Sequence, residues 1–525
     1  MGSGWGRVKL IDFFDRGASL DPQHPCLIDD AGVRSYGQVQ AMTHRVANAC
    51  IRDGINVGTK VAVFSPNQAC AFEVLLGCIR AGCVWVPVSA RATIDDIVHT
   101  LKLTETEFLL YSASLADEVA RVALQCPELR AFVCIDAGPA LLPSGHRSLG
   151  QWLEGTAETS LERSYGDDAL ATLVCTGGTT STPKAVMTSH RAWEARVAAT
   201  LLRVPCERPV QLVATPMTHA AGAGSLELMA LGPTTVILPR FDPARVIDAI
   251  ARHRVTHLFL PPTAIYRLLD HPQVREGDYR SLRYFTYAAA PMSVHKLKEA
   301  LAVFGPVMEQ GYGSTELGTS TCTLQPAEHA QALAAGDDAR LGSCGRPTPL
   351  TRLEIMDDAG RLLPAGELGE IVVRSSCTAG GYYKNPQETA RAFAGGWYHT
   401  GDVGLKDAQG WVYIRDRKSD VIISGGFNVY PSDVERALTG HDAVHDCAVI
   451  GVPHEYWGEA VLALVELKPN ATLGEAELLA WVRERLTGYK VPKGIAFRDL
   501  PRSPVGKVLK RLIRSEYWRG TDRKI

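Results

Sequence analysis

The sequence has almost no excess charge and no long apolar run, and both shortages exclude classes of protein. Its 525 residues carry 55 Lys and Arg against 57 Asp and Glu, whereas a general nucleic-acid binder needs a large basic excess for its phosphate contacts. No stretch of about 18 uncharged apolar residues occurs, so we expect no membrane span. Residues 1–14 contain Arg7, Lys9 and Asp12 and do not resemble a secretory signal. The last three residues are neither a peroxisomal address nor a prenylation box.

Paired-cysteine spacings are also missing. The chain has 13 cysteines, and no two are separated by two residues, which argues against a disulfide framework and a zinc ribbon. Most lie among apolar neighbours, so we expect buried, reduced thiols in a cytoplasmic protein. The hydrophobic fraction of 46% and the charged fraction of 21% are those of a folded globular protein. At roughly 150 residues per domain, the length suggests about three structural units.

Helical and strand-like segments alternate through the first half of the chain. This alternation predicts parallel sheets covered by helices, in two related α/β layers. The expected helices are 35–53, 69–81 and 93–103, and the expected strands are 60–64, 83–88, 108–111, 130–135, 211–214, 235–238 and 257–260.

The remainder of the chain has two other textures. Short strands at 352–356, 369–374 and 410–414, divided by Gly- and Asp-rich turns, predict a small antiparallel β unit. Beyond residue 417, Ser432 with Glu435 and Thr472 with Glu475 have the spacing of helix capping boxes, and apolar residues at 478, 479, 482 and 486 predict an amphipathic helix. The fold class is therefore α/β: a large N-terminal domain with two α/β layers and a β subdomain, followed by a small α+β domain.

The most informative stretch is Thr176-Gly177-Gly178-Thr179-Thr180-Ser181-Thr182-Pro183-Lys184. It follows an apolar run at 169–174, which we expect to be a strand, and precedes a helix expected to begin near Arg191. Clustered glycine and hydroxyl residues let N–H and O–H groups surround phosphate oxygens, and the lysine adds a positive charge. Because the Gly-Lys-Ser/Thr ending of a Walker A loop is absent, the stretch predicts a phosphate-binding loop of another kind.

Four further motifs follow this loop. With it they resemble the motifs of the adenylate-forming superfamily, which includes acyl-CoA synthetases, nonribosomal adenylation domains and luciferases. The resemblance extends over essentially the whole chain, and five motifs in the family's order leave little room for coincidence. The four are Gln310-Gly311-Tyr312-Gly313-Ser314-Thr315-Glu316, Thr400-Gly401-Asp402, Arg415-Asp416-Arg417-Lys418-Ser419-Asp420 and Pro504-Val505-Gly506-Lys507.

The resemblance implies a role for each motif. Tyr312 would lie against adenine, Glu316 with Thr315 would bind Mg²⁺ beside the nucleotide phosphates, and Asp402 with Arg417 would contact the ribose or the phosphates. Lys507 would be catalytic, because its ammonium group would bridge the incoming carboxylate and the α-phosphate. The implied ATP- and AMP-binding residues are Thr176, Gly177, Gly178, Thr179, Thr180, Lys184, Ala289, Gly311, Tyr312, Gly313, Asp402 and Arg417.

The resemblance also implies where the acid and coenzyme A bind. His219, in Pro216-Met217-Thr218-His219, would form the gate between the acyl pocket and the CoA tunnel, and the tunnel would pass Gly425, Gly426 and Phe427. The implied acyl pocket is lined by His219, Gly222, Thr286, Ala289, Gly311, Thr319 and Ser320. This lining has no Lys or Arg to pair with a second carboxylate and no Asp to hold an ammonium group, so it favours a hydrophobic monocarboxylic acid, aliphatic or aryl.

These motifs imply an ATP-dependent, Mg²⁺-requiring acid–CoA ligase, a monomer or homodimer, that forms acyl-AMP and transfers the acyl group to CoA. A domain of residues 1–416 would hold the substrates, residues 417–420 would be the hinge, with Lys418 and Ser419 as its pivot, and residues 421–525 would form a mobile lid. Two alternatives stay open: an enzyme that loads a carrier-protein thiol, and a non-catalytic nucleotide or acyl-adenylate binder. The chain departs from the family's usual residues at Ser181, Ala185 and Ser419.

Overall fold

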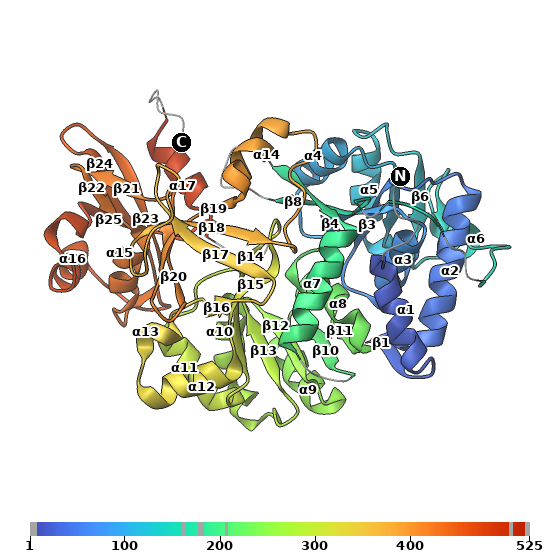
Figure 1. Cartoon of the computed structure of the whole chain (residues 1–525), viewed down its shortest axis with the longest axis horizontal. Helices are drawn as coiled ribbons and strands as arrows, with labels where there is room; N and C mark the ends of the chain where they lie inside the picture. The colour runs from blue at the N-terminus through green and yellow to red at the C-terminus, as the bar shows by residue number, and fades with distance from the viewer. Residues whose placement is uncertain are drawn as a thin grey trace. The chain divides into compact units, whose positions relative to one another are not determined.

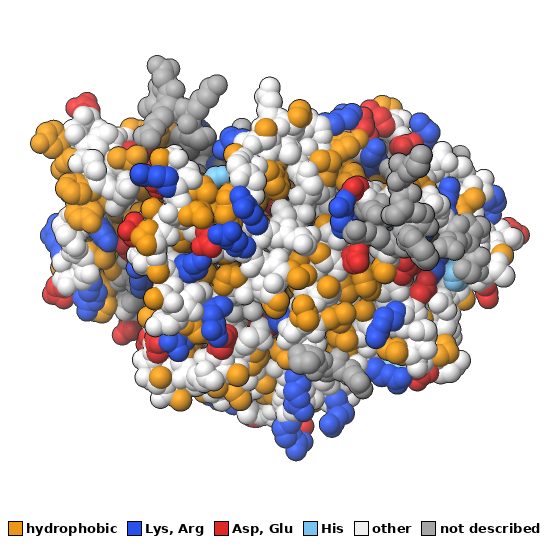
Figure 2. All heavy atoms as spheres, viewed as in Figure 1, with side chains coloured by type: hydrophobic (Ala, Val, Ile, Leu, Met, Phe, Trp, Pro, Cys, Tyr) orange, Lys and Arg blue, Asp and Glu red, His pale blue; other side chains and the backbone are white. Residues whose placement is uncertain are grey.

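The structure is a computed structural model that describes residues 8–159, 163–166, 168–176, 183–204, 208–502 and 508–519, without the side chains of residues 141, 319 and 320. The chain divides into two compact units. The first contains the described residues up to Arg352 together with Arg374–Tyr398, and the second contains Leu353–Val373 together with the described residues from His399 onwards. Basic and acidic side chains are interspersed on the surface that Figure 2 shows. No helix among the described residues is long and apolar enough to cross a membrane.

A seven-stranded sheet occupies the N-terminal half of the first unit (Figure 1). Its strands are parallel except for the last, which runs antiparallel to its neighbour. The order across the sheet is β7 (Arg147–Ser148), β6 (Ala131–Cys134), β5 (Phe108–Tyr111), β3 (Lys60–Ser65), β4 (Val84–Ser89), β8 (Leu170–Thr176) and β9 (Lys184–Ser189). The chain leaves β3 towards β4 and leaves β5 in the opposite direction, towards β6, so the switch point lies between β3 and β5 and their carboxyl ends are the expected place for a ligand.

A nine-stranded sheet forms the rest of the first unit. Six central strands are parallel, and the edge strands β2, β15 and β16 are antiparallel. The order is β16 (Arg346–Pro347), β15 (Gly318–Leu324), β14 (Met308–Ser314), β13 (Tyr284–Tyr287), β12 (His257–Leu260), β10 (Val210–Val213), β11 (Thr234–Ile237), β1 (Pro25–Asp29) and β2 (Gly32–Ser35). Here the switch point lies between β10 and β12.

Helices cover these sheets because their apolar stripes need a partner surface. The first unit's helices are α1 (Leu10–Leu20), α2 (Tyr36–Arg52), α3 (Ala69–Arg80), α4 (Ile94–Thr104), α5 (Ala116–Ala123), α6 (Leu149–Trp152), α7 (His190–Arg203), α8 (Ala220–Leu228), α9 (Pro243–His253), α10 (Pro262–Leu269), α11 (Val294–Phe304), α12 (Pro326–Ala335), α13 (Asp338–Leu341) and α14 (Pro386–Ala392). The helix α3 is so enclosed that Val74, Leu76 and Ile79 are completely buried. α7 packs against α8, and α8 packs on β10 (Figure 1).

The second unit holds two sheets. A four-stranded sheet has the order β17 (Thr351–Met356), β18 (Gly369–Ser375), β19 (Tyr398–Lys406) and β20 (Val412–Arg417). A second sheet contains β21 (Ile422–Ser424), β22 (Phe427–Val429), β23 (Val444–His454), β24 (Gly458–Leu467) and β25 (Gly494–Phe497). The helices α15 (Pro431–Thr439) and α16 (Glu475–Arg483) contact each other, and α17 (Lys510–Tyr517) packs on β23.

The structure confirms the predicted α/β class, and helices or strands lie at every range listed above, with ends that differ by a few residues. The strand β9 was not predicted. Both capping boxes are wrong, because α15 begins after Tyr430 and α16 after Gly474, without a side-chain cap. The apolar stripe of α16 is confirmed by buried Leu478 and Val482. The boundary at residue 416 concerns movement and stays a prediction.

Candidate active site

A cavity of about 960 Å³, counting the space open to solvent, lies in the first unit where the two sheets present their strand ends. Its wall includes residues 65–67 after β3 and 89–91 after β4, from the seven-stranded sheet. It also includes residues 216–218 after β10 and 239–240 after β11, from the nine-stranded sheet. Of these strands, β3 and β10 flank the switch points of the two sheets. Ligands of open α/β sheets bind beside such points, so the topology supports this cavity as a candidate site.

The chemistry of this cavity suits a ligand with an apolar part and anionic groups. Phe72, Leu75 and Met217 form part of its apolar wall, while the exposed residues Arg91 and Arg240 also line it. Trp85 is 6% exposed, and its Nε1 has no hydrogen-bond partner among the described residues. A buried indole N–H normally has an acceptor, so Trp85 offers a donor to a bound molecule.

Asn67, which follows β3 of the seven-stranded sheet, binds the segment that precedes the predicted gate residue His219. Its Oδ1 accepts from the backbone N of Met217 at 2.9 Å, and its Nδ2 donates to the carbonyl oxygens of Thr215 at 2.9 Å and Leu238 at 3.2 Å. His219 is the N-cap residue of α8. It is among the exposed residues, yet the surrounding protein lowers the pKa of His219 by desolvation, so its imidazole is neutral near pH 7.

The predicted Mg²⁺ ligand is held by buried groups. Glu316 is 8% exposed, its carboxylate accepts from Tyr382 Oη at 2.9 Å, and its carbonyl oxygen accepts from Ala379 N at 2.7 Å. Arg196 donates from Nη2 to the carbonyl oxygen of Thr315 at 3.0 Å. A carboxylate has about four lone-pair sites, and Mg²⁺ takes one or two carboxylates together with substrate phosphates. The oxygen donors of Glu316 and Thr315 therefore fit this ion.

Lys184, at the start of β9, already has an anionic partner. Its Nζ makes an ion pair with Glu388 and lies 5.1 Å from the centre of the Tyr382 ring. The hydrogen bond from Arg391 and then that from Lys184 lower the pKa of Glu388 to about 2. Thr176, at the end of β8, faces this lysine across the hairpin, since the two residues are paired in register. The residues 177–182 between them, with four predicted phosphate contacts, lie outside the described residues.

The residues predicted around the acid come from β13, β14, β15 and α8. Gly222 and Gly311 are buried and Thr286 is partly buried. Of the neighbouring residues predicted to bind the nucleotide, Tyr312 is partly buried and Gly313 is exposed. A Cβ on Gly222 would meet the carbonyl oxygen of Met217 at 1.8 Å, so this position requires glycine.

Ala289 is unusual among these predicted residues. Its φ of 72° lies in the left-handed region, which costs a non-glycine residue free energy and clusters at functional sites. The backbones of Thr319 and Ser320 belong to β15, but their side chains lie outside the description.

The remaining predicted residues belong to the second unit. Arg417 Nε and Asp402 Oδ1 are 2.8 Å apart, and Asp402 N donates to Thr400 Oγ1 at 3.0 Å. Gly425 and Gly426 form the two-residue turn between β21 and β22, with φ of 58° and 83°, as a hairpin turn of this length requires. Phe427 is 58% exposed and stacks on Tyr489 at 4.9 Å. Lys507 lies outside the described residues.

The predicted hinge is held on both of its sides. Lys418 Nζ pairs with Asp358 at 2.7 Å and with Glu370 at 3.3 Å, next to the four-stranded sheet. Arg514 of α17 donates from Nη1 to the carbonyl oxygen of Ser419 at 2.8 Å and makes an ion pair with Asp420. These contacts attach Lys418 to the four-stranded sheet and Ser419 to the C-terminal helix. Two consecutive residues of the predicted hinge are therefore held by different elements.

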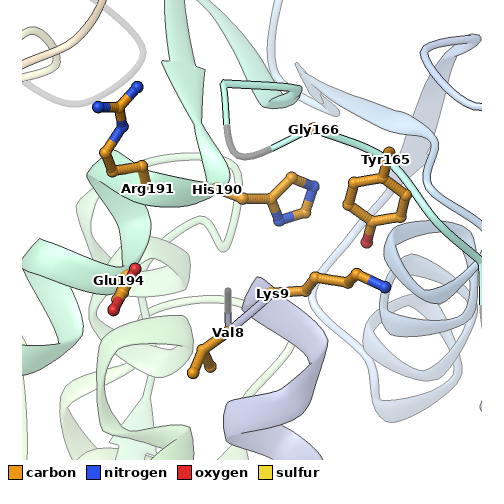
Figure 3. Close-up of a pocket in the computed structure, with 7 residues that line it drawn as sticks. All are labelled: Val8, Lys9, Tyr165, Gly166, His190, Arg191 and Glu194. Carbon is orange, nitrogen blue, oxygen red and sulfur yellow. The ribbon is translucent and has the colours of Figure 1, made fainter. Parts of the chain in front are cut away.

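A separate small cavity of about 230 Å³ lies beside α7 (Figure 3). Figure 3 shows Lys9, Tyr165 and His190 pointing into it. Tyr165 Oη and His190 Nε2 have no partner within the described part of the chain. Burial lowers the pKa of His190 to about 4. We assign no function to this cavity.

The active-site residues that the sequence did not indicate are Asn67, Trp85, Arg91, Arg196, Arg240, Tyr382 and Glu388. Three of them, Asn67, Arg91 and Arg240, directly follow strands of parallel sheets, and that position was the signal available for them. The others carry no signal in the sequence, because they reach the site from α7, from the interior of β4 or from the segment around α14.

Comparisons with known proteins agree with these features. The family profile described as "AMP-binding enzyme" matches residues 14–383, and that described as "AMP-binding enzyme C-terminal domain" matches residues 433–507. A feruloyl-CoA synthase from an Amycolatopsis species is 33% identical over 96% of this chain and 98% of that protein. A fatty acid–acyl-carrier-protein ligase from Streptomyces coeruleorubidus is 30% identical over 97% and 96%. The solved amide bond synthetase from Marinactinospora thermotolerans has a TM-score of 0.86 and 30% identity, covering 97% and 100%.

Proposed function

This chain belongs to the family of AMP-binding enzymes and, within it, to the acyl-CoA synthetases, and we propose that it joins a hydrophobic monocarboxylic acid to free coenzyme A. In the first half-reaction, a carboxylate oxygen of the acid attacks the α-phosphorus of ATP. The bond to the bridging oxygen of the pyrophosphate breaks, and acyl-AMP forms. In the second, the CoA sulfur attacks the acyl carbonyl carbon, the thiol proton is released and AMP leaves.

The proposed roles of the residues follow from their surroundings. Glu316 would hold the Mg²⁺ that neutralises the phosphate charge. Lys184 would bind the nucleotide phosphates after giving up its ion pair with Glu388. Asp402 would accept hydrogen bonds from the ribose hydroxyls, and Lys507 would bridge carboxylate and α-phosphate during the first half-reaction. Neutral His219 would form the gate through which the thiol approaches.

The observation that carries free CoA as the acceptor is the cavity beside His219. Coenzyme A brings a nucleotide with phosphate groups, which need a hollow and cationic side chains. Arg91 and Arg240 supply the charge, and Trp85 Nε1 supplies a donor. A carrier protein presents its phosphopantetheine arm from its own surface and carries no nucleotide, so its partner needs no cavity for one.

The first experiment compares acceptors. Purified enzyme with ATP, Mg²⁺ and an activated acid is given free CoA, an acylatable carrier protein or a simple amine, and AMP release is measured. We expect CoA to be preferred by at least tenfold in kcat/KM. A preference for the carrier protein or for the amine would overturn the acceptor assignment, and the absence of acid-dependent pyrophosphate release with every acid would overturn the ligase assignment.

The second experiment tests the cavity. Arg91→Ala and Arg240→Ala should each raise KM for CoA by about five- to thirtyfold, since a lost charge-assisted contact costs on the order of 1–2 kcal/mol. Both variants should release pyrophosphate normally in the first half-reaction. Arg245→Ala is the matched control, because Arg245 lies on the next helix outside the cavity lining, with a side chain that is 42% exposed and pairs with Asp30 at 2.6 Å. An unchanged KM in both cavity variants would place CoA elsewhere.

The third experiment tests Lys507. Lys507→Ala should lower the rate at which acyl-AMP forms from acid and ATP by about 10²–10³-fold, as the loss of an oxyanion donor does. It should largely spare thioester formation from supplied acyl-AMP. Equal loss of the two half-reactions would contradict the proposed role.

A further inference from the structure

One face of the nine-stranded sheet continues inward from the residues predicted to bind the acid. Register pairs Gln211 with His257, His257 with Tyr284, and Thr286 with Glu309. Because alternate residues of a strand share a face, these side chains lie on the face that also carries Gly311. His257 and Gln211 are in register with Tyr284, two residues before Thr286 along the strand. Gly311 lies in the opposite direction along the strands, two residues after Glu309, the partner of Thr286.

An ion pair occupies this face behind Thr286. Arg203, at the end of α7, pairs with Glu309, whose side chain is fully buried. The same carboxylate accepts from Thr286 Oγ1 at 2.8 Å and from Gln325 Nε2 at 3.1 Å. The hydroxyl of Thr286 thus has a partner on the side of the ion pair. An extended apolar tail would have to push into this charged layer and separate or desolvate the pair, which is costly.

Two buried polar atoms on this face of the sheet have no hydrogen-bond partner in the described part of the chain. His257 Nε2 and Gln211 Oε1 have no hydrogen-bond partner among the described residues, and the two side chains are 6% and 5% exposed. Burial lowers the pKa of His257 to about 4, so the ring is neutral, and its Nδ1 lies 2.7 Å from Thr256 Oγ1. A Cβ on Gly224 of α8 would meet only Gln211 Nε2, at 3.8 Å. Space therefore lies between α8 and the side chain of Gln211.

We propose that His257 and Gln211 form a polar floor that closes the inner end of the acid pocket and selects a compact acid with a hydrogen-bonding group opposite its carboxylate. With the proton of His257 on Nε2, a hydroxyl group satisfies both atoms, since it accepts from His257 and donates to Gln211 Oε1. Four residues separate the level of His257 from that of Gly311, which is about 13 Å of strand. This length, shortened by the floor's own side chains, suits one ring with a short side chain. The inference rests on the proposed ligase function.

The test is the acid preference of the wild-type enzyme, measured as kcat/KM for pyrophosphate release. The panel contains cinnamic acid, 4-hydroxycinnamic acid, octanoic acid and hexadecanoic acid. We expect 4-hydroxycinnamic acid to exceed cinnamic acid at least tenfold, because a site that hydrogen-bonds a hydroxyl discriminates strongly against its absence, and hexadecanoic acid to be the poorest. Equal rates for the two ring acids, or a preference for hexadecanoic acid, would overturn the proposal.

A variant locates the effect. In His257→Phe the preference for the hydroxylated acid over cinnamic acid should fall at least fivefold. His253→Phe, on α9, is the matched control and should retain the preference. If His257→Phe does not fold, the wild-type panel decides alone. Acid binding is followed in parallel by the rise in thermal unfolding temperature. An enzyme that binds the hydroxylated acid selectively but releases no pyrophosphate would refute the ligase function and keep the floor, whereas turnover without selectivity would refute the floor alone.

Discussion

Glu73 on α3 is a buried carboxyl whose ionisation opposes folding. Its side chain is 4% exposed, and its nearest cation is Arg34, with Nε 3.6 Å from Oε1 on a side chain that is 51% exposed. Desolvation raises the pKa of Glu73 from 4.5 to about 7; Arg34 offsets part of this rise and Asp29 adds to it. We predict that Glu73→Gln, which keeps the shape and removes the charge, stabilises the protein at alkaline pH.

The magnitude follows from this rise. Below about pH 4.5 the carboxyl is protonated in both the folded and the unfolded state, so its ionisation has no effect. Between pH 4.5 and 7 the unfolded state loses its proton first, and the wild type loses stability as the pH rises. The full difference is about 3 kcal/mol at 1.36 kcal/mol per pH unit. Above pH 7 the gap between variant and wild type should stay constant.

Thermal unfolding at pH 5, 6, 7 and 8 measures this gap. We expect the unfolding temperature of Glu73→Gln to exceed that of the wild type by about 3–6 °C at pH 8 and by much less at pH 5. Glu128→Gln, at an exposed glutamate, is the control and should follow the wild type. A gap that is independent of pH, or a variant that is less stable than wild type at pH 8, would refute the reasoning. Pyrophosphate release at saturating substrate should be unchanged.

Three other changes test ion pairs nearer the predicted site. Arg203→Met should destabilise the protein by about 3–5 kcal/mol, because it leaves a buried carboxylate unpaired, and adding Glu309→Gln should restore much of this in a double-mutant cycle. Glu388→Gln should lower the free energy of unfolding at neutral pH. The difference between variant and wild type should narrow by about 1 kcal/mol between pH 5.5 and 3.5, since a carboxyl with a lowered pKa stabilises the folded state only while it is ionised. A difference that stays constant with pH would contradict this. Arg514→Met should raise tryptic cleavage after Lys418 at least fivefold, as expected for the loss of about 1–3 kcal/mol of restraint, and unchanged cleavage would show that Arg514 does not restrain the hinge.

The parallel strands could be predicted from the sequence because each is a short apolar run between turn residues. The strand β9 was not predicted, because its residues begin directly at the Pro-Lys end of the phosphate loop, where the sequence predicted a continuing loop and then a helix. In the structure β9 returns antiparallel to β8 and places Lys184 opposite Thr176. The phosphate loop therefore joins two strands, and the helix α7 begins only afterwards, at His190.

The capping-box predictions failed because the same residue types served tertiary contacts. Pro431 occupies the first turn of α15, so the helix begins one residue before Ser432. The hydroxyl of Ser432 donates instead to the carbonyl oxygen of Arg415, and its backbone N donates to Asp416 Oδ2 at 2.7 Å. Glu435 accepts from Val449 N at 2.8 Å and pairs with Lys510 at 2.6 Å. A local pattern cannot reveal such partners, since they lie between 14 and 75 residues away.

The character of the acid shows how sequence and structure combine. The predicted pocket lining contains no Lys or Arg, and this absence argued against a second carboxylate. The structure does bring a cation behind the lining: Arg203 lies next to the carboxylate that binds Thr286. That arginine is already paired with Glu309, so the layer supplies no free charge to a substrate. Neutral, unpartnered atoms of His257 and Gln211 are what it offers. The preference for one carboxylate therefore persists for a different reason, and a neutral hydrogen-bonding group becomes the feature by which this enzyme would distinguish its acid.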